Sequence, residues 1–113
     1  MELIDLVKQS LSIVSTVTLK DDEISMWIEA GKQDLLRQNI NINIEDALIT
    51  SAIVMYVKAN FGNVDIKEKE LSQKTYNLFC NNLSLSDAYR AGESNVWRKL
   101  LFAFYYLSRR WNR

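Results

Sequence analysis

The stretch of residues 44–62 constrains the fold most, because it is the longest run with apolar residues on nearly every side. Two apolar stripes recur along it at helical spacing, one of Leu48, Ala52, Met55, Tyr56 and Ala59 and the other of Ile49, Ile53 and Val57. A helix that is apolar all round belongs inside a bundle. Asn43 is expected to cap its first turn, and Gly62 suits a left-handed residue just past its end.

Four further segments have helical periodicity: residues 2–12, 23–37, 66–82 and 95–111. Gly31 lies on the apolar stripe of residues 23–37, which predicts a close approach to a neighbouring helix. In residues 66–82, the side chains expected to face inward are Leu71, Thr75, Leu78 and Phe79, with Tyr76 beside them. The pattern predicts an all-α fold, a small bundle of about four core helices plus a C-terminal amphipathic helix. Its expected core residues include Ile24, Trp27, Ile28, Leu48, Ala52, Ile53 and Tyr56.

Three segments between these helices are harder to assign from pattern alone. Residues 12–19 are rich in β-branched side chains, but they have no comparable strand to pair with and are interpreted as a connection. Residues 39–44 alternate asparagine and isoleucine as a half-buried strand would, although a loop with inward isoleucines suits their place between two helices. Residues 83–95 read as a linker.

The composition argues against catalysis and requires no cofactor. The 113 residues suffice for one domain, and they contain no histidine, one cysteine and three isolated glycines. Histidine metal sites, thiolate metal sites and glycine-rich phosphate loops are therefore excluded. Cys80 is interpreted as a buried inert thiol rather than a nucleophile. The acidic run at Asp21, Asp22 and Glu23 could recruit a divalent ion, but helix capping explains it more simply.

Charge and hydropathy limit the partners and the compartment. Fourteen basic and fourteen acidic residues cancel, which removes a global electrostatic reason to bind nucleic acid or an anionic membrane. No apolar run approaches the roughly 20 residues of a membrane span, and the opening residues lack a secretory signal pattern. A single cysteine excludes an intrachain disulfide and favours a reducing compartment.

The C-terminal tail is the polarised part of the chain, with six basic and two acidic residues from Asp87 onward. Its helix could complete the core, or it could be an interaction helix, since tryptophan and arginine are enriched at interface hot spots. An anionic membrane or nucleic acid could also use such features. The dense aromatic residues favour a protein groove. The candidate docking residues are Trp97, Arg98, Leu100, Leu101, Phe104, Tyr105, Arg109, Arg110 and Trp111.

The order of motifs resembles one known family. A short helix is followed by DDEI at residues 21–24, a helix over 27–36, a central helix ending VKANFGN at 57–63, and KTYNLFCNNLSLSDAY at 74–89. This order over about residues 1–90 is similar to the head-to-tail connector, or adaptor, proteins of tailed bacteriophages, which are often described as DNA-packaging proteins.

The resemblance implies a structural virion protein rather than an enzyme. It implies a homo-oligomeric ring, expected to be a dodecamer, that sits under the portal protein, extends the DNA channel and joins the head to a stopper or tail-completion protein. Duplex DNA would pass through without specific binding, and no membrane is involved. Residues 1–90 would form the connector domain and residues 91–113 a docking helix that grips the portal. The location would be the virion neck, and the host cytoplasm during assembly. A small nucleic-acid-binding regulator is the alternative function.

Overall fold

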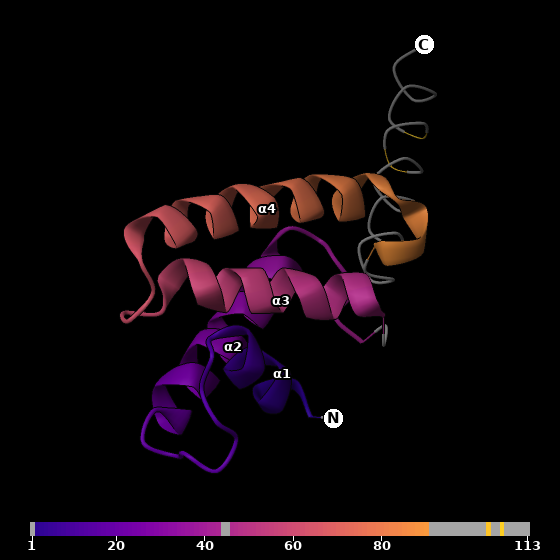
Figure 1. Ribbon diagram of the computed structural model, residues 1–113. Helices are drawn as coiled ribbons and strands as arrows, with labels where there is room; N and C mark the ends of the chain where they lie inside the picture. The colour runs from indigo at the N-terminus through magenta and orange to yellow at the C-terminus, as the bar shows by residue number, and fades with distance from the viewer. Residues whose placement is uncertain (1, 44–45, 91–103, 105–106, 108–113) are drawn as a thin grey trace.

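The computed structural model describes residues 2–43, 46–90, 104 and 107. Its elements are α1 (Leu3–Ser10), α2 (Asp21–Arg37), α3 (Ala47–Asn60), α4 (Ile66–Leu85) and one turn of 3-10 helix, η1 (Asp87–Tyr89). Helix α3 contacts the other three helices, with α4 antiparallel along one side and α1 on the other (Figure 1). Helix α2 starts on the side of α1 and crosses α3, so that its end contacts α4. No strand occurs within these ranges, so the all-α prediction is confirmed. The expected helix over residues 95–111 falls outside them, except that Phe104 and Leu107 are helical.

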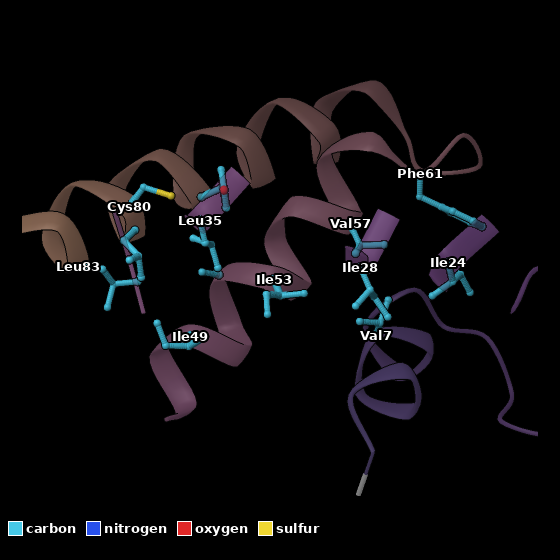
Figure 2. Packing of buried hydrophobic residues seen from close by; sticks show 13 residues of the cluster. Val7, Ile24, Ile28, Leu35, Ile49, Ile53, Val57, Phe61, Cys80 and Leu83 are labelled. Carbon is cyan, nitrogen blue, oxygen red and sulfur yellow. The ribbon is translucent and has the colours of Figure 1, made fainter. Parts of the chain in front are cut away.

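The core forms where α3 meets its three neighbours. Figure 2 shows buried side chains from all four helices meeting around α3. The fully buried residues with the largest side chains are Phe61, Ile24, Leu35, Ile40, Leu83, Val7 and Val57. Of the residues expected in the core, Ile24, Ile28, Ala52 and Ile53 are buried, and Trp27 and Tyr56 are partly buried against them.

Leu48 does not lie in this core, contrary to expectation, because it is 43% exposed. The buried face of α3 is centred on Ile49, Ile53 and Val57. One residue advances roughly 100° around a helix, so Leu48 lies at the edge of that face, in the first turn. The second of the two predicted stripes is therefore the better guide to what α3 buries.

Both predicted ends of α3 are wrong in detail. Asp46 rather than Asn43 caps the helix, since its Oδ1 accepts a 2.8 Å hydrogen bond from the amide of Leu48. The helix ends at Asn60, and Phe61 leaves it in an extended conformation with φ −67°. Gly62 is not left-handed, because no glycine within the described residues has positive φ. The helix thus ends at an extended residue whose side chain is buried in the core, without a left-handed glycine.

The predicted close approach at Gly31 is confirmed. A Cβ atom built on Gly31 would lie 3.0 Å from Cδ1 and 3.2 Å from Cγ of Tyr56 in α3. The Tyr56 ring in turn packs edge-on against Tyr76 of α4, with centroids 5.2 Å apart. Gly31 therefore lets α2 approach α3 closely enough for one tyrosine to join three helices.

The predicted inward face of α4 is wrong for its two leucines. Leu71 and Leu78 are each 64% exposed, whereas the buried residues of this helix are Ser72, Tyr76, Cys80 and Leu83. Thr75 and Phe79 are partly buried. Two faces of α4 carry apolar residues at helical spacing, and α3 covers only one of them. The Leu71 and Leu78 face is rotated from the buried face by more than one residue step.

The connecting segments follow the sequence only in part. Residues 11–20 form an irregular connection, and Ile40 is buried while Ile42 is partly buried, as the loop interpretation predicts. Ile44 is outside the described residues. The linker predicted from residue 83 is wrong at its start, because α4 continues to Leu85 and η1 follows it.

Candidate interaction surfaces

A cluster of polar side chains joins α2 to α4. The Tyr76 hydroxyl donates a 2.5 Å hydrogen bond to Asp34 Oδ2. The side-chain amide of Gln38 donates to the same oxygen at 2.9 Å and to Cys80 Sγ at 3.5 Å. Arg37 also pairs with Asp34. These bonds satisfy polar groups between two helices, so the cluster has a structural role.

The ionisation of this cluster fits that structural role. Burial opposes the charged form of Asp34, but the hydrogen bonds from Tyr76, Arg37 and Gln38 outweigh it and lower the pKa of the carboxyl group. Burial, with the hydrogen bond to Asp34, raises the pKa of Tyr76 well above its usual range. Burial likewise raises the pKa of the Cys80 thiol, which stays protonated and unreactive near neutral pH.

A buried lysine organises the connection between α1 and α2. Lys8 is 3% exposed, and its Nζ lies 2.6 Å from Asp21 Oδ1 and donates to the carbonyl of Ser15 at 3.2 Å. Asp21 therefore starts α2 as an ion-pair partner, and no side-chain cap bond is present at Lys20. The capping role predicted for the acidic run is wrong in this respect. No group of three potential metal ligands occurs within the described residues.

The segment after α4 is fastened to the start of α3. The Tyr89 hydroxyl donates a 2.6 Å hydrogen bond to Asp46 Oδ2, and the carbonyl of Tyr89 accepts one from the amide of Asn41 at 2.7 Å. The hydrogen bond from Tyr89, together with the amide of Leu48, lowers the pKa of Asp46. Arg90 forms an isolated antiparallel bridge with Ile40. These contacts fix the place where the chain enters residues 91–113.

The outer face of α4 presents aliphatic side chains to solvent. Leu71, Leu78 and Leu85 are 64%, 64% and 77% exposed and follow one another at seven-residue intervals; we call them the leucine row. Seven residues are almost two helical turns, so the three side chains lie along one line. The sequence analysis placed Leu71 and Leu78 in the core. Their seven-residue spacing, which Leu85 continues, indicates only that the three side chains share one side of the helix.

Helix α2 presents a second partly apolar surface. Met26 is 54% exposed and Leu36 is 41% exposed. Near Leu36, an open groove of about 610 Å³ is lined by Ala30, Gln33, Asp34, Leu36, Arg37 and Tyr56. No helix within the described residues is both long and apolar enough to cross a bilayer.

The candidate docking residues of the tail lie outside the described residues, with one exception. These are Trp97, Arg98, Leu100, Leu101, Tyr105, Arg109, Arg110 and Trp111. Phe104 is described, and its side chain is 71% exposed, while Leu107 three residues later is 54% exposed. Neither side chain is therefore enclosed by the four-helix bundle.

Comparison with known proteins decides the family. A family model described as phage connector protein matches residues 3–90, more than three quarters of the chain. This chain belongs to the phage connector family. The match ends at the Arg90 bridge, so it covers all four helices and η1 of this connector. No curated protein and no solved structure gives a comparable match.

Membership sets the general role of this connector. Phage connectors are structural rather than enzymatic components of the virion neck, where they oligomerise and contact portal or tail proteins. The resemblance seen in the sequence is confirmed at this level. The exposed apolar faces of α2 and α4 are the described surfaces that suit such contacts.

Proposed function

We propose that this chain is the head-to-tail adaptor that forms a ring under the portal, extends the DNA channel and joins the head to the stopper or tail. The family match over residues 3–90 carries this proposal. The structure supports it with a compact four-helix bundle that keeps large aliphatic side chains exposed on α4. Such side chains gain free energy when a neighbouring protein covers them, about 1.5 to 3 kcal/mol each before ordering costs.

We further propose that residues 91–113 dock on the portal while residues 1–90 form the ring. Two observations support this division. The bundle is closed by Tyr89 and Arg90, which lie against Asn41, Asp46 and Ile40. Beyond that point, Phe104 and Leu107 are helical yet exposed, as expected for an apolar face that meets its partner only in the assembly.

Electron microscopy of the purified protein mixed with its portal tests the proposal. The expected result is an additional ring of density beneath the portal, coaxial with the channel. A second sample containing protein that ends at Arg90 should leave the portal bare. Portal particles without added density in the first sample would contradict the adaptor role.

A further inference from the structure

The leucine row on α4 is accompanied by two lysines on the same side of the helix. Lys67 and Lys74 are exposed, and they precede and follow Leu71 by four and three residues, so all three share one face. The two lysines are seven residues apart, which places them about 10 Å from each other along the axis. Neither lysine forms an ion pair with any described residue.

The exposed face of α2 carries the opposite charges at the same spacing. Asp22 and Glu29 are exposed and seven residues apart, and Met26 lies between them on the same face. Asp22 has no ion-pair partner within the described ranges, and Glu29 is paired only with Lys32 of the same helix, at 3.4 Å. The exposed face of α2 therefore has the order acid, apolar residue, acid, which is complementary to the order lysine, leucine, lysine on α4.

We propose that, in the ring, α4 of one copy packs along α2 of the next copy, with Lys67 and Lys74 opposite Asp22 and Glu29. This proposal rests on the proposed ring-forming function and names the surface that builds the ring. With the two helices parallel, Leu71 meets Met26. Leu78 then reaches the level of Gln33, where the groove beside Ala30 and Leu36 can receive it.

The place of the two helices in the fold suits repeated assembly. Helix α2 begins on the side of α3 away from α4, and only its end contacts α4, through Asp34 and Gln38. The exposed face near the start of α2 and that of α4 therefore belong to different surfaces of the molecule (Figure 1). A contact between two different surfaces is heterologous, so each copy can bind one neighbour through α4 and the other neighbour through α2. Repetition of such a contact closes into a ring when the rotation per copy permits.

Two charge-reversed variants of the full chain test the pairing. Variant K67E/K74E gives two acidic faces, and variant D22K/E29K gives two basic faces. Each variant alone should form at least about tenfold less ring than the wild type, measured by sedimentation velocity and by particle counts on portals at low salt. An equimolar mixture of the two variants should restore ring formation in alternating order. The acidic α4 of K67E/K74E then meets the basic α2 of D22K/E29K, and the unaltered basic α4 of the second meets the unaltered acidic α2 of the first.

The direction of the helices is tested with single reversals. Variant D22K/K67E should assemble better than variant D22K/K74E, since only the first restores the opposite charges of the parallel arrangement. The reverse order would overturn the arrangement. Variant K20E/K69E is the matched control: it changes the net charge by the same amount as K67E/K74E but lies off both faces, and it should form rings like the wild type.

The remaining outcomes separate this inference from the proposed function. Thermal melts of each variant exclude unfolding as the cause of lost assembly. If the wild type forms rings and the reversed variants do so equally well, the α2–α4 pairing is wrong and the adaptor role stands. If the wild type forms no ring, alone or on portals, both are overturned. Loss in the mixture as well as in each variant would also overturn the pairing.

Discussion

The Tyr89 hydroxyl and the Asp46 carboxylate are joined by a 2.6 Å hydrogen bond across 43 positions of sequence. Asp46 is also the N-cap of α3, where its other oxygen accepts from the amide of Leu48. The same side chain thus starts the central helix and fastens the last described turn. The bundle is complete at Arg90, the residue at which the family match ends.

Deletion of residues 91–113 should therefore leave a folded bundle that no longer binds the portal. The core of residues 2–90 runs from Val7 to Leu83, and Tyr89 and Arg90 close it against Asp46 and Ile40, so the truncated chain keeps all of these contacts. Circular dichroism and a portal pull-down measure the two properties. If the truncated chain unfolds, the tail belongs to the core; if it stays folded and binds normally, the docking role is wrong.

Point substitutions in the tail give a milder version of this test. Trp97→Ala and Phe104→Ala should mainly speed dissociation from the portal, because affinity differences within one interface arise mostly in the off-rate. Arg109→Ala and Arg110→Ala should have smaller effects that fade at high salt, as for charges at an interface rim. Surface plasmon resonance at two salt concentrations distinguishes the two groups.

Substitution by alanine should destabilise the protein far more at the centre of α3 than on the surface of α4. Ile53 is 4% exposed, so Ile53→Ala should lower the free energy of unfolding by about 2 to 5 kcal/mol. Glu68 is 60% exposed and lies 3.7 Å from Lys58, and Glu68→Ala should cost less than about 0.5 kcal/mol. Denaturant titrations provide both values, and equal losses would contradict the position of α3.

Gly31 should tolerate alanine better than valine. Its Cβ would meet the Tyr56 ring at 3.0 Å, but alanine offsets this crowding with a helix propensity gain of about 1 kcal/mol. Gly31→Val adds two methyl groups at the same contact and should destabilise by about 1 to 3 kcal/mol. Ser25→Val, at an exposed position of α2, controls for the propensity of valine. Equal melting temperatures for the two valine variants would refute the close-packing role.

The contribution of Tyr76 should depend on pH through Asp34. Because the pKa of Asp34 is lowered from its ordinary value of 3.8, its stabilising effect is present above that pH and is lost as the pH falls through the lower folded value. Tyr76→Phe should therefore lower stability by about 1 to 3 kcal/mol at pH 7 and by less near pH 3. Urea titrations at both pH values measure the difference, with Tyr56→Phe as the control. A loss that is constant with pH would show that Asp34 does not mediate it.

Duplex DNA should bind weakly to the isolated protein. The 14 basic and 14 acidic residues balance, and a channel lining must let DNA slide. Fluorescence anisotropy at physiological salt should detect no submicromolar, sequence-dependent binding. Such binding would favour the alternative role of a small nucleic-acid-binding regulator.

The sequence predicted the helices well and their exposed faces poorly. Periodicity found all four described helices, and the glycine on the stripe of residues 23–37 correctly indicated close packing against α3. The same rule assigned Leu71 and Leu78 to the core, because an exposed apolar face has the same period as one buried within the chain. The two apolar faces of α4 differ only in that α3 packs against one of them.

Local signals also failed where a distant residue decides the outcome. Asn43 and Asp46 are both good caps, and the choice of Asp46 is reinforced by Tyr89, far away in sequence. The buried ion pair of Lys8 with Asp21 could not be foreseen either, since nothing near Lys8 in the sequence marks it as interior. Such pairings depend on how the helices meet.

Because Cys80 is buried, modification of its thiol can report local opening of the helical bundle. The thiol is 3% exposed and faces α2 through Gln38, so a thiol-specific reagent can reach it only when α4 lifts away from its neighbours. The rate of modification therefore measures how often this helix opens. Comparing that rate in the free chain and in particles bound to portals would show whether assembly clamps α4, with no label or substitution added to the protein.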